Sequence, residues 1–411
     1  MTHDIGLIVE YNPFHNGHLY HLQEAAKAFP DSRLICVMSG NWVQRGEPAA
    51  FNKWARARMA LEAGADLILE LPLVFALQSA DRFAFGAVKT LAGSGVVSHL
   101  CFGSELGDLG PLKKIAALLA EEPPRFKALL KEALHEGCSY PTALSRACSG
   151  YFSDDELSHI IQSPNNILGV EYLKNLLKTR AKITPFTILR TGAGYHSLDL
   201  EGSIASASAI RKGLKEGNER IFQAMPAAGS RIISLEIKAG RGPVFPEALN
   251  EPLMALLRRA TLKELSALPD MEEGLPQRFA RICRSTATLE EFLARAATKR
   301  YTLSRLHRIL CYLLMDINRR DLDSFNRAGP RYLRVLGFSP RGQEALHAMK
   351  KKGALPLITR PAKYFRHSRD KRGKKMLALD IKGGDLYNLL YPKAPNRRGG
   401  EDYSKSPIKI G

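Results

Sequence analysis

The chain has 411 residues, 45% of them hydrophobic, which is enough to bury the cores of two or three domains and excludes a disordered tail or a small disulfide-stapled module. Sixty Lys and Arg residues against 41 Asp and Glu residues give a net charge of +19, which favours nucleic acid or another anionic partner. A soluble enzyme that happens to be basic is the alternative.

Short apolar runs alternate with amphipathic segments over the first 110 residues. Residues 5–9, 34–38, 67–71 and 96–102 are predicted strands, and residues 17–29, 52–63 and 80–91 carry apolar side chains at helical spacing. Continuously apolar strands separated by helices predict an α/β fold whose parallel sheet is covered on both faces. A ligand of such a sheet binds beyond the carboxyl ends of its strands.

The following segment is predicted to be helical at 112–120, 124–136, 142–149 and 166–177, then to return with a strand at 184–189 and a short helix after Ser206. Pro and Gly residues gathered between 220 and 245 predict a boundary. We expect a Rossmann-like domain over residues 1–225, with a helical insertion around 111–178, and a basic, mostly helical domain over 245–411. Residues 392–411 are expected to form a loosely held tail.

Six cysteines are scattered along the chain without a CxxC pair, mostly within apolar runs. This pattern favours reduced thiols in a protein core over disulfides or a zinc site. The N-terminus lacks the basic segment of a signal peptide, and no run of about 18 apolar residues occurs. We therefore expect a cytoplasmic protein without membrane association.

The loop after the first predicted strand carries His15-Asn16-Gly17-His18, directly before a predicted helix. Gly17 lets the backbone approach a triphosphate, and the helix start, with Asn16 as its expected N-cap, directs free N–H groups at phosphate oxygens. His15 and His18 share one helix face and can both donate to phosphate as charge builds at the α-phosphorus. This spacing does not favour a zinc-binding pair, and no protein metal site is expected.

The segment GLIVEYNPFHNGHLYHL (6–22) resembles the opening signature of the tRNA(Met) cytidine acetate ligase family, a branch of the HxGH nucleotidyltransferase superfamily. Further segments agree with the family in order: SGNWVQRGEPA (39–49), FGSE (102–105), SPNNILGVEYLK (163–174), ILRTGAGYHS (188–197), SIASASAIRK (203–212) and KRYTLSRLHRIL (299–310). The resemblance implies a nucleotidyltransferase fold. It also implies an enzyme that makes acetyl-adenylate from acetate and ATP and then acetylates N4 of the wobble cytidine in elongator tRNA(Met).

SIASASAIRK stands in the place of the second superfamily signature. Ser206 and Ser208 offer hydroxyls at a helix start to the β- and γ-phosphates, and Arg211 can neutralise the leaving pyrophosphate. The expected catalytic groups are therefore His15, His18, Ser206 and Arg211. Together with the resemblance, these motifs imply ATP contacts from Gly6, Leu7, Ile8, Val9, Glu10, Tyr11, Asn12, Pro13, Phe14, Asn16, Gly17, Leu19, Tyr20, Gly103, Asn165, Arg190 and Ser208, of which Asn165 is implied by the resemblance alone. Mg²⁺ is expected with the triphosphate.

Several of these residues also have ordinary structural interpretations. Asn165 or Asn166 is expected to be the N-cap of the helix that follows. Trp42, after the second strand, is equally compatible with stacking on a flipped base and with a place in the core. Glu10 and Asp66 are the acidic groups nearest to strand ends, and the sequence gives neither a partner that marks it as a base.

Basic residues recur through the carboxyl half, and residues 341–411 contain 18 basic and six acidic side chains. Basic side chains follow phosphates, and the Tyr and Phe residues interleaved with them can stack on unpaired bases. Arg331, Arg334 and residues 350–352 belong to this pattern. The expected tRNA contacts are Lys299, Arg300, Arg305, Arg308, Arg366, Arg369, Lys371 and Arg372.

Two alternative functions stay open at the level of sequence. A small-molecule adenylyltransferase of the pantetheine-phosphate or nicotinate-mononucleotide type would use the same HxGH chemistry, but it gives no reason for the basic carboxyl half. A non-catalytic RNA-binding protein that retains a nucleotide fold would explain the charge. The intact motifs argue against the second alternative.

Overall fold

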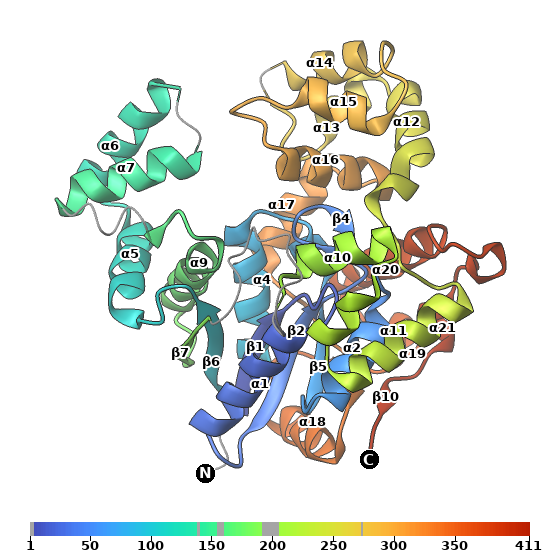
Figure 1. Ribbon diagram of the computed structural model, residues 1–411. Helices are drawn as coiled ribbons and strands as arrows, with labels where there is room; N and C mark the ends of the chain where they lie inside the picture. Colours follow the sequence, from blue (N-terminus) through green and yellow to red (C-terminus); the bar gives the residue numbers. More distant parts are fainter. Residues whose placement is uncertain (1–3, 138–139, 154–159, 191–204, 273) are drawn as a thin grey trace.

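A computed structural model describes residues 4–137, 140–153, 160–190, 205–272 and 274–411 (Figure 1). A single large sheet lies at its centre, in the order β10-β8-β5-β2-β1-β6-β7, with β9 added to β8. The strands are β1 (Asp4–Val9), β2 (Arg33–Ser39), β5 (Leu67–Leu71), β6 (Val97–Ser104), β7 (Thr184–Leu189), β8 (Leu333–Phe338), β9 (Leu357–Ile358) and β10 (Ile408–Lys409). The short strands β3 (Trp42–Val43) and β4 (Glu47–Pro48) form a separate hairpin.

The strands from β5 to β7 are mutually parallel, as their continuous apolar sequences predict. Each strand predicted in the amino-terminal half forms within about two residues of its expected bounds. The order 5-2-1-6-7 places β2 and β6 on opposite sides of β1. The chain connections therefore leave β1 in opposite directions, which opens a crevice at the carboxyl ends of β1 and β6.

Helices cover both faces of this sheet. Leu7 and Cys36 belong to a core with α1 (Asn16–Ala28), α2 (Lys53–Glu62), α10 (Ala207–Glu216) and α11 (Ala227–Ala239). Ile8 and Val37, one residue further along each strand, belong to a core on the other face, because successive strand side chains point to opposite sides. That face carries α3 (Leu73–Ala76), α4 (Ala80–Gly93), α5 (Leu109–Glu121), α9 (Pro164–Thr179) and α18 (Pro340–Lys352).

The remaining helices lie outside these layers. The helices α6 (Pro124–His135) and α7 (Tyr140–Phe152) pair with each other and project beside α5 (Figure 1). A helical cluster above the sheet comprises α12 (Asn250–Arg259), α13 (Leu262–Ala267), α14 (Leu275–Ile282), α15 (Leu289–Ala296), α16 (Leu303–Met315) and α17 (Arg319–Ala328). The chain continues through α19 (Pro361–His367), α20 (Lys371–Asn388) and α21 (Glu401–Ser404), and short 3₁₀ helices span Glu219–Ala224, Pro246–Leu249 and Ala394–Asn396.

The carboxyl half is mostly helical, as expected, but it also completes the sheet of the amino-terminal half. Strand β8 pairs antiparallel with β5, and β10 pairs parallel with β8. The Pro- and Gly-rich stretch at 220–245 therefore does not separate two sheets. The prediction of a loose tail is wrong, because residues 401–404 form α21, Asp402 is 3% exposed and the chain ends as an edge strand.

Five cysteines, Cys36, Cys101, Cys148, Cys283 and Cys311, are buried and unbridged, as their apolar surroundings predict, and Cys138 lies outside the described residues. Within the parts of the chain that the structure describes, no helix has both the length and the apolar character needed to span a bilayer.

Candidate active site

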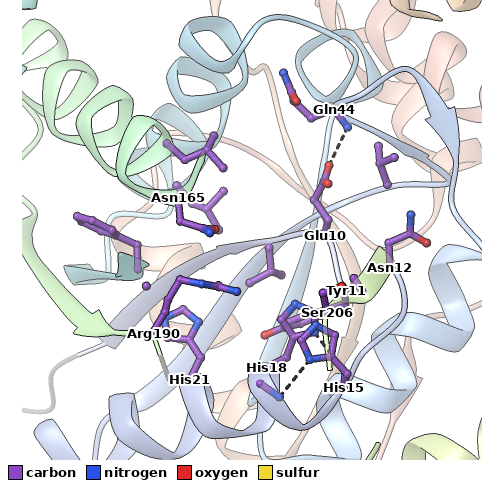
Figure 2. Close-up of a pocket in the computed structure, with 18 of the residues that line it drawn as sticks. Glu10, Tyr11, Asn12, His15, His18, His21, Gln44, Asn165, Arg190 and Ser206 are labelled. Carbon is purple, nitrogen blue, oxygen red and sulfur yellow. Dashed lines mark hydrogen bonds between the residues drawn. The ribbon is translucent and has the colours of Figure 1, made fainter. Parts of the chain in front are cut away.

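A cavity of about 260 Å³ opens at the carboxyl ends of β1, β6 and β7, where the strand order predicts a ligand (Figure 2). It is bordered by the loop after β1, the starts of α1, α9 and α10, and the hairpin of β3 and β4. Fifteen of the predicted catalytic or ATP-contacting residues line it: Ile8, Val9, Glu10, Tyr11, Asn12, His15, Gly17, His18, Tyr20, Gly103, Asn165, Arg190, Ser206, Ser208 and Arg211.

The two motif histidines hold each other at the start of α1. His15, rather than the expected Asn16, is the N-cap, because its Nδ1 accepts a hydrogen bond from the Gly17 N–H at 3.1 Å. The His18 Nδ1 accepts in turn from the His15 N–H at 3.3 Å, and the two rings stack with centroids 3.7 Å apart. Since Nδ1 of each ring is an acceptor, a neutral ring carries its proton on Nε2, where it is a donor.

Burial and neighbouring positive charges keep the histidine rings of this cavity neutral. Burial, reinforced by the charges of Arg190 and Arg211, lowers the pKa of His15 to about 3. Burial likewise holds the pKa of His18 well below its usual range and lowers the pKa of His21 to about 4. The histidines and the two arginines together form a site short of negative charge, which a triphosphate would supply.

The second signature meets the first at this cavity. The helix α10 begins directly after Ser206, as predicted, and Ser206 caps it by accepting from the Ala209 N–H at 3.0 Å. The Arg211 guanidinium donates to the Asn12 carbonyl at 2.8 Å and to the Ser208 hydroxyl at 3.2 Å. Arg211 therefore joins the start of α10 to the loop after β1. Ser203 and Ile204, and residues 191–197 of the segment ILRTGAGYHS, lie outside the described residues.

The FGSE and SPNN segments meet through a carboxylate. Glu105 accepts from the Asn165 and Asn166 backbone N–H groups at 3.2 and 2.8 Å and from the Asn165 side chain at 2.7 Å. The expectation that either asparagine is the N-cap is wrong: Ser163 holds that position without a side-chain bond, and Glu105 satisfies the helix start from another element. Gly103 lines the cavity where an added Cβ would lie 3.2 Å from Arg190 Cγ, so a larger residue would displace that arginine.

Other predicted ATP contacts do not line the cavity. Gly6, Leu7, Pro13, Phe14, Asn16 and Leu19 lie elsewhere. Leu7 and Phe14 are core side chains, because they face the layer under α1, and the Asn16 amide donates to the Gln223 carbonyl at 3.1 Å. Trp42 is a core residue, 1% exposed, whose indole N–H donates to the Gly383 carbonyl at 2.8 Å.

The sequence reasoning missed several residues at the site. His21 lines the cavity and follows His18 by one more helical step, a spacing that could have revealed it. Tyr172 reaches the cavity from α9. The buried Arg56 guanidinium donates to the carbonyls of Glu10 at 2.5 Å and Phe51 at 2.9 Å, and also to that of Gly40, so it holds the ends of β1 and β2. No local pattern marks an arginine that acts on distant carbonyl groups.

The predicted RNA contacts divide by exposure. Lys299, Arg300 and the basic cluster (Arg366, Arg369, Lys371 and Arg372) are exposed. Arg308 is only 9% exposed, and Arg305 donates to the Asp270 carbonyl, because α16 packs its basic face against neighbouring elements. Arg334 is 1% exposed and pairs with Asp402, so it belongs to the core.

Comparison with known proteins identifies the family. The model of a family described as HIGH Nucleotidyl Transferase matches residues 2–402. A tRNA(Met) cytidine acetate ligase of Acetivibrio thermocellus is 43% identical to this chain over 98% of this chain and 99% of the relative. The chain belongs to the tRNA(Met) cytidine acetate ligase family.

Further members and solved structures agree with this assignment. A tRNA(Met) cytidine acetate ligase of Halothermothrix orenii is 41% identical over 98% of this chain and 99% of its own length. The crystal structure of apo Thermotoga maritima TmcAL covers 100% of both chains with a TM-score of 0.96 and 38% identity. The crystal structure of the same protein bound with alpha-thio ATP matches with a TM-score of 0.94 and 37% identity. The predicted nucleotidyltransferase fold with a helical carboxyl-terminal region is thus confirmed.

Proposed function

We propose that this chain activates acetate with ATP as acetyl-adenylate and transfers the acetyl group to N4 of the wobble cytidine of elongator tRNA(Met). AMP and pyrophosphate are the other products. The observation that carries the proposal is the stacked pair of His15 and His18. With the charges of Arg190 and Arg211, the Nε2 donors of this pair form an anion site. The relatives of this chain are named for this ligation. Since its RNA substrate is cytoplasmic, the proposal includes a cytoplasmic location.

In the first step, acetate attacks the α-phosphorus and pyrophosphate leaves. The His15 and His18 Nε2 donors stabilise charge on the phosphates, as do Arg211 and the positive ends of the helix dipoles at the starts of α1 and α10. Arg190, at the end of β7, also places its charge near the three histidines. Cytidine N4 is a weak nucleophile because its lone pair is delocalised into the ring, so an activated acyl donor is needed.

Mg²⁺ is proposed to enter with ATP rather than to occupy a protein site. Among the described residues, no group of three His, Cys, Asp or Glu side chains is arranged to hold a metal, and Glu10 and Glu47 are the carboxylates that line the cavity. These residues fit an ion held mainly by phosphate oxygens and water, which would neutralise part of the triphosphate charge.

The tRNA is proposed to bind the basic cluster together with Lys299 and Arg300. These six side chains are exposed, and Phe365, in the helix that begins the cluster, is partly buried beside Tyr403. Arg305 and Arg308 are left out of this surface because of their burial and internal contacts.

The test is to incubate the protein with labelled acetate, ATP and bulk tRNA and to digest the RNA to nucleosides. Label in N4-acetylcytidine together with acetate-dependent AMP release is the expected result. The His18→Ala variant should lose acetyl-adenylate formation and still bind tRNA, whereas His347→Ala, an exposed histidine on α18, should behave as wild type. Binding of RNA without ATP consumption, or adenylylation of a small phosphorylated acceptor instead, would overturn the proposal.

A further inference from the structure

Glu10 places a carboxylate in the cavity at the end of β1 (Figure 2). Its Oε1 accepts from the Gln44 backbone N–H at 2.7 Å and from the Ser39 hydroxyl at 3.2 Å. Within the described residues, no hydrogen bond is made to Oε2. The carboxylate is thus oriented through one oxygen, and the other remains available to a ligand.

The surroundings of Glu10 increase its affinity for a proton. Burial raises the pKa of Glu10, although the Gln44 N–H, the Ser39 hydroxyl and the charges of Arg56 and Arg211 oppose that rise. The cavity also contains the aromatic rings of Phe83 from α4, Phe102 from β6 and Tyr172 from α9. Burial, and after it the charge of Glu10, raises the pKa of Tyr172, so the phenol that lines the cavity with Glu10 is neutral.

The other titratable groups that line the cavity are poorer proton acceptors. The three histidines have lowered pKa values, and Nδ1 of His15 and of His18 is already occupied by a backbone N–H. Burial alone would raise the pKa of Glu47, but its contact with His307, 3.4 Å away, and nearby arginine charges lower it overall. Glu10 is therefore the lining group best suited to accept a proton.

We propose that Glu10 is the general base of acetyl transfer, which rests on the function proposed above. The amino nitrogen N4 forms a bond to the acetyl carbonyl carbon of acetyl-adenylate, and the bond from that carbon to the phosphate oxygen breaks, so that AMP leaves. One N4 proton passes to Oε2 of Glu10 and from there to solvent. Oε1 stays bound to Gln44 and Ser39 and keeps the base in place.

The test is the Glu10→Gln variant of the full chain, with the two steps measured separately. The amide oxygen of glutamine can still accept from Gln44 and Ser39, so the orientation is kept while the base is lost. Acetate-dependent exchange of labelled pyrophosphate into ATP, without tRNA, reports any loss of the predicted contact between Glu10 and ATP and should fall far less than the transfer step. Single-turnover transfer of the acetyl group to tRNA should fall by roughly 10²- to 10⁴-fold, the usual size of general-base catalysis.

The pH profile distinguishes a base from a structural residue. The wild-type transfer rate should rise with pH as the Glu10 carboxyl loses its proton, and Glu10→Gln should lack this limb. Glu344→Gln, an exposed glutamate on α18, should keep both the rate and the limb. If Glu10→Gln does not fold, Glu10→Asp serves instead, with slower transfer and a retained limb as the expected result.

Three results for Glu10→Gln would overturn the inference. The first is acetyl transfer at the wild-type rate, and the second is an unchanged rise of the transfer rate with pH. The third is an equal loss of both steps in a folded variant, which would place Glu10 in substrate binding. Failure of the wild-type protein to produce N4-acetylcytidine would instead count against the proposed function. Wild type is therefore assayed in parallel.

Discussion

The buried charge cluster around Asp402 predicts how firmly the end of the chain is held. Asp402 Oδ1 lies 2.7 Å from Lys53 Nζ and 2.9 Å from Arg334 Nη2, and all three side chains are at most 3% exposed. Lys53 has a second carboxylate partner in Glu70, at 2.9 Å, whereas Arg334 pairs only with Asp402 among the described acidic residues. Asp402→Asn therefore leaves the buried Arg334 without an ion-pair partner, because its cross-strand neighbour Glu70 is already paired with Lys53.

Removing one partner of a buried ion pair costs about 3–5 kcal/mol in the free energy of unfolding. With an unfolding entropy of about 2.1 cal/mol/K per residue, this corresponds to a fall in Tm of roughly 3–6 °C for a chain of this length that unfolds cooperatively. Differential scanning calorimetry measures the shift. Glu401→Gln, which removes only the partly exposed contact with Lys405, is the control and should cost about 0–1 kcal/mol. Equal Tm values for Asp402→Asn and Glu401→Gln would refute the reasoning.

Three further predictions concern the site, the RNA surface and the core. ATP binding at pH 7 should leave His15 and His18 neutral, because their pKa values are low and Nδ1 of each ring already accepts from a backbone N–H; calorimetry in buffers of different ionisation enthalpy should show the same proton uptake for wild type and for the His15→Gln, His18→Gln variant. Alanine at all four positions of the basic cluster should weaken tRNA binding and reduce its salt dependence, measured by filter binding at several salt concentrations, without slowing acetate activation. Burial, followed by the charge of Glu70, raises the pKa of Asp380 to about 8, above its unfolded value of about 3.9. The protonated carboxyl therefore stabilises the fold at low pH, and this contribution is lost as pH rises towards 8. The stability of wild type relative to Asp380→Asn should fall from pH 5 to pH 8, and a difference that does not change with pH in denaturant titrations would contradict the assignment.

The local parts of the fold were predictable because local patterns encode them. Buried parallel strands are mostly apolar, so residues 67–71 match β5 at both ends, and the edge strand β7, which is buried at only two residues, also matches its predicted bounds of 184–189. The start of α10 directly after Ser206 was predictable from the helical spacing that begins there, although the Ser206 hydroxyl was assigned to phosphate and not to the Ala209 N–H that it caps. The HxGH motif predicted the paired histidines for a similar reason, although the cap falls on His15 because the ring, rather than the Asn16 amide, reaches the Gly17 N–H.

Long-range contacts explain what the sequence could not reveal. The sequence around Arg334 and Asp402 predicts solvent-exposed charges, yet the two side chains form a buried ion pair. Glu105 caps a helix that begins about 60 residues later, and Arg56 binds carbonyl groups of three other segments. Nothing in the spacing of these residues encodes such partners. The oriented carboxylate of Glu10 was hidden for the same reason, since Gln44 and Ser39 lie on another strand and its loop.

Strand β5 stays without its partner β8 for part of the synthesis of the chain. Strand β5 ends at Leu71 and its partner begins at Leu333, so the edge of β5 remains open while the ribosome makes the intervening chain. At about 5–20 residues per second this takes roughly 15–50 s. An unpaired apolar edge is a template for association with other chains. The β5 edge is therefore exposed to such association throughout this interval, and slow translation of the carboxyl half would lengthen the exposure.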